Sequence, residues 1–182
     1  MIRVKSLDQI IKFLKEGKIG VMPTDTIYGI VGSALNPETV EKIYTLRKRS
    51  KNKPFIILIS SINDLKKFDI KLSKEQEVFL QKIWPNPVSV VLHNLAFRMP
   101  KNKKLLALLR EVGPLVAPSA NIEGEPPAQN IDEAKKYFGN RVDFYLDGGK
   151  IESSPSTLIK LASDGLYHIL RQGAFQKFPK DL

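Results

Sequence analysis

The chain has 182 residues, 42% of them hydrophobic and 26% charged, which is typical of one globular domain and not of a disordered chain. It has no cysteine and two histidines, which excludes a disulfide framework, a thiolate metal site and a cysteine nucleophile. Its formal net charge of +10 favours polyanionic partners, but charge alone does not distinguish nucleotides from nucleic acid.

The first third of the sequence predicts alternating helices and strands. Ser6 is placed to cap a helix, because apolar residues follow it at the spacing of one helix face. Asn36 followed by Pro37 is typical of a second helix start. The predicted elements are a helix from Ser6 to Gly17, a buried strand at 19–22, a polar loop at 24–29, a helix from Asn36 into the basic run 47–53, and a buried strand at 55–59.

The rest of the sequence continues this mixture, with an irregular segment where two prolines occur in Trp84-Pro85-Asn86-Pro87. The predicted elements are helices at 61–68 and 73–83, strands at 88–92 and 96–99 joined by a turn at His93-Asn94, a helix at 105–112, a strand at 115–117, a helix at 130–138, and strands near 142–146, 157–161 and 167–170. We therefore expect an α/β fold with a mixed sheet. Because no linker or internal repeat divides the chain, we expect a single domain over 1–182.

Nothing in the sequence predicts a membrane segment. The N-terminal stretch lacks the apolar core of a signal peptide, and no run of about 18 apolar residues occurs elsewhere. We therefore expect a cytoplasmic protein with no membrane partner.

Four polar segments follow or precede apolar elements, at 23–29, 47–54, 118–129 and 154–173. They carry hydroxyl groups, amides and cations, with few carboxylates. If the fold brings them together, they form a pocket for anions, because arginine binds phosphate or carboxylate with a planar pair of donors. The usual phosphate-binding loops are absent, and Asp147-Gly148-Gly149-Lys150 is better interpreted as a turn.

Eight short motifs follow one another between Gly20 and about Phe175. They are Pro23-Thr24-Asp25-Thr26-Ile27-Tyr28-Gly29, the basic run before Pro54, Trp84-Pro85-x-Pro87, Phe97-Arg98-Met99-Pro100, Ala117-Pro118-Ser119-Ala120-Asn121, Asp147-Gly148-Gly149, Ser156-Thr157 and Leu170-Arg171-Gln172-Gly173. In these motifs and in their order the sequence resembles the YrdC-type threonylcarbamoyl-AMP synthases. The resemblance implies a twisted mixed sheet of parallel and antiparallel strands, flanked by helices, around a large concave basic cavity.

The resemblance also implies a nucleotidyltransferase that joins L-threonine, bicarbonate and ATP into threonylcarbamoyl-AMP and pyrophosphate for tRNA modification. ATP would be a substrate and would carry Mg²⁺, with no metal site on the protein. Other threonylcarbamoyl transferase proteins would consume the product. The implied catalytic residues are Arg47, Arg49, Ser119 and Asn121, and the implied substrate-binding residues are Thr24, Thr26, Tyr28, Lys48, Lys53, Arg98, Ser156, Thr157 and Arg171.

Two alternatives remain open at this point. Where the family has lysine this chain has Arg47 followed by Lys48, and either cation fits the role. The alternative function is a non-catalytic module that contacts tRNA or double-stranded RNA through phosphates.

Overall fold

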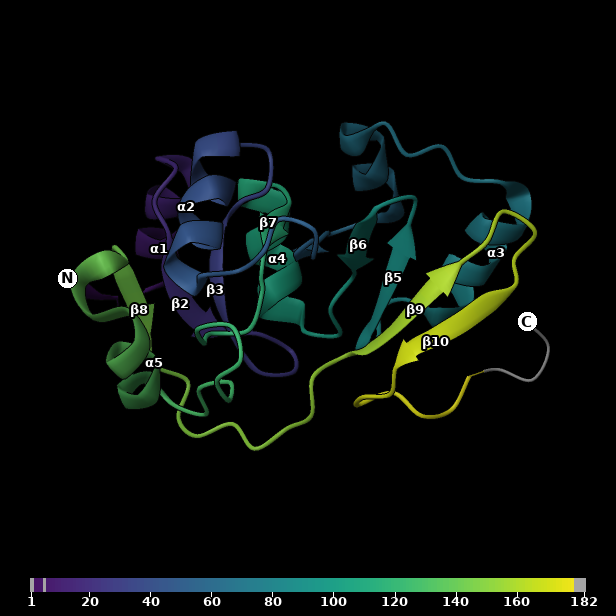
Figure 1. Ribbon diagram of the computed structural model, residues 1–182. Coiled ribbons are helices and arrows are strands. Elements are labelled where there is room, and N and C mark those ends of the chain that lie inside the picture. The colour runs from purple at the N-terminus through teal and green to yellow at the C-terminus, as the bar shows by residue number, and fades with distance from the viewer. Residues whose placement is uncertain (1, 5, 179–182) are drawn as a thin grey trace.

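The computed structural model of the chain describes residues 2–4 and 6–178 (Figure 1). Ten strands of these residues form a sheet in the order β1-β8-β2-β3-β7-β4-β6-β5-β9-β10. Parallel and antiparallel neighbours both occur, so the predicted mixed sheet is confirmed. The strands are β1 (Ile2–Val4), β2 (Gly20–Pro23), β3 (Tyr28–Ser33), β4 (Ile56–Leu58), β5 (Val88–Leu92), β6 (Leu95–Arg98), β7 (Leu115–Val116), β8 (Phe144–Leu146), β9 (Thr157–Leu161) and β10 (Tyr167–Arg171).

Helices cover both faces of the sheet. They are α1 (Leu7–Lys15), α2 (Pro37–Arg47), η1 (Ile62–Phe68), α3 (Lys74–Ile83), α4 (Lys103–Val112), α5 (Ile131–Phe138) and η2 (Gly139–Arg141). The apolar faces of α1 and α4 pack in one core cluster, and those of α2, η1, α3 and α5 pack in the other. No helix in the part of the chain that the structure describes is long and apolar enough to cross a membrane.

The central strands divide their side chains between the two clusters. On β4, Ile57 belongs to the larger cluster and Leu58 to the smaller one. The same alternation occurs on β3, where Ile30 and Val31 are both fully buried. Successive side chains of a strand point to opposite faces, so a strand with helices on both sides is apolar throughout.

Most predicted boundaries are confirmed within two residues, because local hydrogen bonds set them. Ser6 caps α1 by accepting a hydrogen bond from the Gln9 backbone N–H, and Asn36 caps α2 in the same way. Asn130 does so for α5. Each of these side chains satisfies an N–H group that a helix start leaves without a partner.

Two predictions about elements are wrong. Tyr28 and Gly29 were expected in a loop, but they begin β3, which pairs with β2 as a hairpin and with β7. Helix α2 ends at Arg47, the first residue of the basic run, because Lys48 adopts a left-handed conformation with φ of 51°. Residues 48–53 therefore form a basic loop between α2 and β4. The helix predicted at 61–68 is present, and it is of the 3₁₀ type.

Candidate functional site

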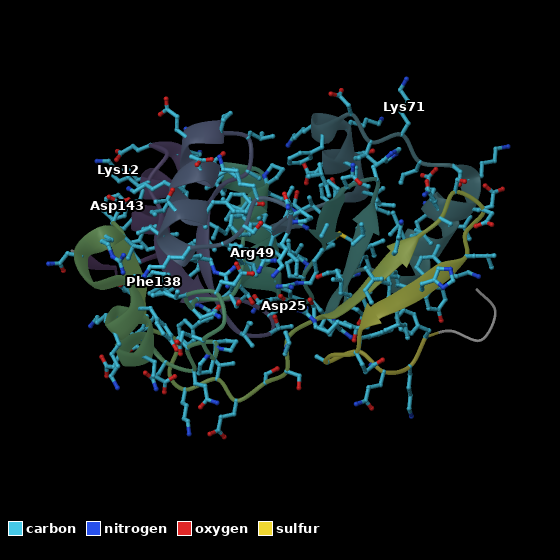
Figure 2. The ribbon with its side chains drawn as sticks, viewed as in Figure 1. Lys12, Asp25, Arg49, Lys71, Phe138 and Asp143 are labelled. Carbon is cyan, nitrogen blue, oxygen red and sulfur yellow. The ribbon has the colours of Figure 1, made fainter. Side chains whose placement is uncertain are left out.

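Segments that are far apart in the sequence meet at one cavity of about 540 Å³, open solvent included. Figure 2 shows Arg49 and Asp25 in the middle of the molecule, between the part with α2 and the part with β5. The residues that line the cavity are Thr24, Thr26, Ile27, Gly29, Arg47, Arg49, Pro54, Phe55, Ile56, Arg98, Ala117, Pro118, Ser119, Pro155, Ser156 and Arg171. The structure thus brings together the predicted residues Thr24, Thr26, Arg47, Arg49, Arg98, Ser119, Ser156 and Arg171.

Four arginines give this cavity its charge. Burial, and then the charge of Arg49, lowers the pKa of Arg47 to about 10. The pKa of Arg171 is lowered by burial and then by the charges of Arg98 and Arg49. Guanidinium groups remain protonated at neutral pH after such shifts, so the cavity is surrounded by cations that repel one another. An anion in this position relieves that repulsion.

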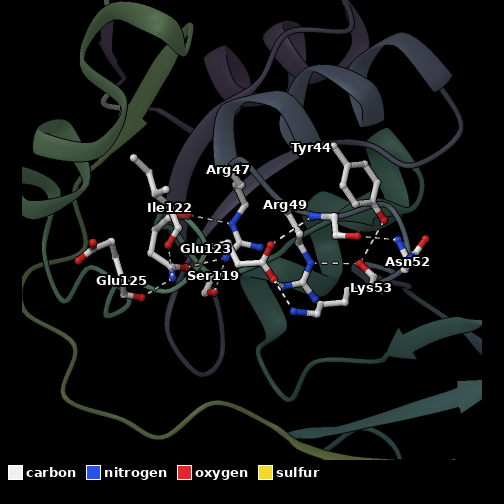
Figure 3. Close-up of polar contacts among 11 residues, drawn as sticks. Tyr44, Arg47, Arg49, Asn52, Lys53, Ser119, Ile122, Glu123 and Glu125 are labelled. Carbon is white, nitrogen blue, oxygen red and sulfur yellow. Dashed lines mark hydrogen bonds and ion pairs between the residues drawn. The ribbon is translucent and has the colours of Figure 1, made fainter.

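Arg47 points from the end of α2 into the segment that follows β7. Its Nε donates to the backbone oxygen of Asn121 at 2.9 Å, and its Nη2 donates to Asn121 Oδ1 at 2.8 Å. The same Nη2 donates to Ser119 Oγ at 3.2 Å (Figure 3). Lys48, the other candidate for the family lysine, is exposed and does not line the cavity. Between the two, the geometry favours Arg47.

Ser119 and Asn121 differ in what they offer a ligand. Asn121 accepts from Arg47, and its Nδ2 donates to the backbone oxygens of Ile122 at 3.0 Å and Glu125 at 2.6 Å. Its carboxamide is therefore used within its own loop. Ser119 accepts from Arg47, and no described residue accepts a hydrogen bond from its hydroxyl. The Ser119 hydroxyl is thus free to donate to an oxygen atom in the cavity.

A buried ion pair joins the loop after β2 to β6. Arg98 Nη2 donates to Asp25 Oδ1 at 2.9 Å, and each side chain is 4% exposed. Burial lowers the pKa of Arg98, while Asp25 acts in the opposite direction. Asp25 Oδ2 and Arg98 Nε have no hydrogen-bond partner among the described residues. The pair therefore fixes the hairpin loop with one hydrogen bond and leaves one buried carboxylate oxygen and one buried guanidinium N–H without a partner among the described residues.

The hairpin loop orders its own hydroxyl groups. Thr24 Oγ1 donates to the backbone oxygen of Ile27 at 2.7 Å and accepts from the Thr26 backbone N–H at 3.2 Å. The hydroxyl of Thr26 lies 3.3 Å from that of Thr24. Because Thr24 has only one hydroxyl proton, Thr26 is the donor in this contact. The lone pairs of Thr26 then remain available to a donor in the cavity.

Ser156 and Arg171 complete the opposite wall. Ser156 Oγ lies 2.8 Å from Ser89 Oγ, in a pair that is buried beside the cavity. Arg171 Nη2 donates to the backbone oxygen of Ser156 at 2.8 Å. This bond holds the guanidinium beside the start of β9, and both residues line the cavity.

Five predicted residues do not line the cavity, namely Tyr28, Lys48, Lys53, Asn121 and Thr157. The Tyr28 hydroxyl donates to the Gly149 backbone oxygen and accepts from the Gly148 N–H, both at 2.8 Å, so it anchors the Asp147-Gly148-Gly149 turn.

Thr157 is also engaged inside the fold. Its hydroxyl donates to the backbone oxygen of Phe175 at 2.6 Å and accepts from the Gly173 N–H at 3.0 Å and the Phe175 N–H at 3.1 Å. Gly173 passes so close to this strand that a Cβ there would overlap the Pro155 carbonyl oxygen. The motifs Ser156-Thr157 and Arg171-Gln172-Gly173 are therefore two sides of one contact.

Sequence reasoning missed three residues that shape the site. Asp25 lay inside a quoted motif, but its pairing with Arg98 is a contact across 73 positions. Phe55 lies under the two neighbouring guanidinium groups, at 5.9 Å from Arg47 Cζ and 5.8 Å from Arg49 Cζ. Glu123 contacts the basic run, and the only signal in the sequence was its position two residues after Asn121.

Comparison with known proteins assigns the family. The family model of Sua5, YciO and YrdC, described as Telomere recombination, matches residues 12–173. The chain belongs to the Sua5/YciO/YrdC family. Its match covers most of the sequence, and it includes every segment that lines the cavity.

Relatives within the Sua5/YciO/YrdC family align over nearly the whole chain. A Methanocaldococcus jannaschii protein is 32% identical over 186 residues, which cover 94% of this chain and 87% of the relative. Threonylcarbamoyl-AMP synthase of Bacillus subtilis is 27% identical, over 93% of this chain and 54% of that protein. The crystal structure of Pyrococcus abyssi Sua5 complexed with L-threonine superposes with a TM-score of 0.81 and 28% identity, over 94% of this chain and 56% of that one. This chain thus spans about half the length of the last two proteins.

Proposed function

We propose that this protein is a threonylcarbamoyl-AMP synthase that acts as a nucleotidyltransferase. It combines L-threonine with bicarbonate to a carbamate, with loss of one water molecule and release of one proton from the ammonium group to solvent. A carbamate oxygen then attacks the α-phosphorus of ATP, a new P–O bond forms, and pyrophosphate leaves with the electrons of the bond that breaks. The product supplies the threonylcarbamoyl group for tRNA modification.

One observation carries this proposal. The cavity is lined by Arg47, Arg49, Arg98 and Arg171 together with the hydroxyls of Ser119 and Thr26. The reaction brings a triphosphate, bicarbonate and a carboxylate into contact, and the repulsion among them must be neutralised before the oxygen approaches phosphorus. Positioning and charge stabilisation meet this requirement without a protein general base, as in other phosphoryl transfers.

The geometry supports different roles for the site residues. Arg49 and Arg171 bind phosphate or carboxylate oxygens, and the free proton of Ser119 donates to the nucleotide. Arg47 holds Ser119 and Asn121 in place. Thr26 accepts from the ammonium group of threonine. In this proposal Mg²⁺ arrives bound to the triphosphate.

The proposal also covers the domain organisation, the location of the protein and the proteins that use its product. Residues 1–182 work as a single YrdC-like domain in the cytoplasm, and threonylcarbamoyl transferase proteins take up the product. Support for this context comes from the family and from the sequence expectations above.

The proposal is tested with the purified chain, ATP, bicarbonate, Mg²⁺ and threonine. We expect pyrophosphate release that depends on threonine. Arg49→Ala abolishes it with little change in stability, because a partly exposed cation contributes little to folding. Lys51→Ala is the matched control, since it removes a neighbouring cation that does not line the cavity. If the wild-type protein releases no pyrophosphate but binds double-stranded RNA in a salt-dependent way that ignores threonine, the alternative function replaces this one.

A further inference from the structure

Glu123 contacts the basic loop between α2 and β4 at three places (Figure 3). Its Oε1 lies 2.9 Å from Lys53 Nζ and 3.8 Å from Arg49 Nη1. Its Oε2 accepts a hydrogen bond from the Ser50 backbone N–H at 3.1 Å. One carboxylate therefore meets two cations and one backbone donor of the same short loop.

The backbone of Glu123 is tied to the same region. Its N–H donates to the backbone oxygen of Arg47 at 2.8 Å, at the end of α2. The residue stands two positions after Asn121, whose backbone and side chain both accept from Arg47. Glu123 thus connects the loop of Ser119 to the loop of Arg49 through its main chain and its side chain together.

The orientation of Arg49 depends on this loop. Arg49 Nε donates to the backbone oxygen of Lys53 at 3.1 Å, and the Tyr44 hydroxyl donates to the same oxygen at 3.3 Å. The Phe55 ring lies against the guanidinium and stacks on Tyr44 at 3.9 Å between ring centroids. Among the described residues, the Lys53 carbonyl is the one backbone acceptor of the Arg49 side chain, so a shift of Lys53 frees the guanidinium to turn away from the cavity.

The charge of Glu123 also fits this position. Lys53 and then the Ser50 N–H lower the pKa of Glu123, so the carboxylate is ionised at neutral pH. It lies beside Arg47 and Arg49, and its charge offsets part of the lowering of the Arg47 pKa that burial and Arg49 cause. Glu123 is more than the partner of one lysine, because its carboxylate also accepts from a backbone N–H of the loop and lies near Arg49.

We propose that Glu123 is a positioning residue that holds Arg49 and the loop 50–53 in the orientation that binds the phosphates of the nucleotide. This inference rests on the proposed function for one point only, that Arg49 is a phosphate ligand. Glu123 itself does not line the cavity and acts through Arg49 and Lys53.

Glu123→Gln tests the proposal, with Glu125→Gln as the matched control. Both variants remove one negative charge from the same loop, but Glu125 is exposed and forms no ion pair with the described residues. We expect Glu123→Gln to weaken ATP binding in calorimetry, and to raise KM for ATP, by roughly three- to tenfold. KM for threonine and the melting temperature should stay near the wild-type values, and Glu125→Gln should behave as wild type.

The outcomes separate the two proposals. ATP binding that is unchanged or tighter in Glu123→Gln would overturn the positioning role, because a mere counter-charge competes with the phosphates and its removal helps ATP. Equal weakening of ATP binding in Glu123→Gln and Glu125→Gln would overturn it as well. So would equal losses of ATP and threonine binding together with a lower melting temperature. A wild-type protein that does not bind ATP would also overturn it. If the wild type binds ATP but releases no pyrophosphate, only the proposed function fails, since calorimetry still measures the effect of Glu123.

Discussion

The hydroxyl of Thr157 holds the segment after β10 against the start of β9. Thr157 is fully buried, and its hydroxyl has three backbone partners, two N–H groups and one carbonyl, on Gly173 and Phe175. Thr157→Val keeps the shape of the side chain and removes all three hydrogen bonds. Arg171 lies two residues before Gly173, so the change should also loosen one wall of the cavity.

The cost follows from the number of bonds. Each lost hydrogen bond contributes about 0.5–1.5 kcal/mol, so three give roughly 1.5–4.5 kcal/mol. Gly173 and Phe175 are half-buried, so water can replace part of the hydrogen bonding that their backbone groups lose with the hydroxyl. We therefore expect Thr157→Val to lower the free energy of unfolding by about 2–3 kcal/mol. Thr157→Ser keeps the hydroxyl and loses one buried methyl group, which costs about 1 kcal/mol.

Urea unfolding of the two variants measures this difference directly. The valine variant should be less stable than the serine variant by about 1–2 kcal/mol, and its KM for ATP should rise while that of the serine variant stays near wild type. Equal stability of the two variants would refute the reasoning, because it would mean that the hydroxyl contributes nothing beyond its volume.

Three further predictions concern other polar contacts. Arg47→Lys keeps the charge but retains at most one of three hydrogen bonds, so we expect a loss of about 1–3 kcal/mol in unfolding free energy and roughly tenfold in kcat/KM for ATP. Tyr28→Phe should lower stability by about 1–3 kcal/mol with near-normal turnover, because its hydroxyl is bound to Gly149 and not to the cavity. Burial acts to raise the pKa of Asp64, but Lys67 and the Ser60 contacts outweigh it and the pKa is lowered, so its stabilising contribution is lost as pH falls from the ordinary value of 3.8 through the lowered one.

Each of these has its own measurement. Chemical unfolding and steady-state kinetics check Arg47→Lys, and wild-type activity would show that holding Asn121 does not matter. A Tyr28→Phe variant that is stable but inactive would indicate instead that the Tyr28 hydroxyl binds the substrate. For Asp64, the unfolding free energy is followed against pH beside Asp64→Asn; the two curves should differ at neutral pH and converge in acid, and parallel curves would contradict the assignment.

Local sequence signals located most elements. Ser6, Asn36 and Asn130 each precede an apolar repeat, and each caps a helix through a neighbouring N–H group. Strand β3 was not predicted, because it is defined by its pairing with β2 and β7. Tyr28 also follows a polar loop that has no turn signal. Pairing between distant segments leaves little trace in the residues themselves.

The site shows the same division. The ordered motifs indicated that Arg49, Ser119, Ser156 and Arg171 would share one cavity, and they do. Residue types did not indicate which polar groups are already engaged. The carboxamide of Asn121 is bonded to Arg47 and to its own loop. The contact with Arg47 spans 74 positions, and no local pattern encodes it.

The sequence by itself determined the α/β class, the helix starts and the chemistry of an anion site, because these depend on periodicity, on short-range hydrogen bonds and on the kinds of side chain present. Only the tertiary structure decided the direction of each side chain. Arg47 and Lys48 are neighbours in the sequence, yet the left-handed turn at Lys48 leaves one buried against Ser119 and the other in solvent. Whether a donor is free for a ligand depends on what lies within about 3 Å of it, and that is set by packing between segments far apart in the chain.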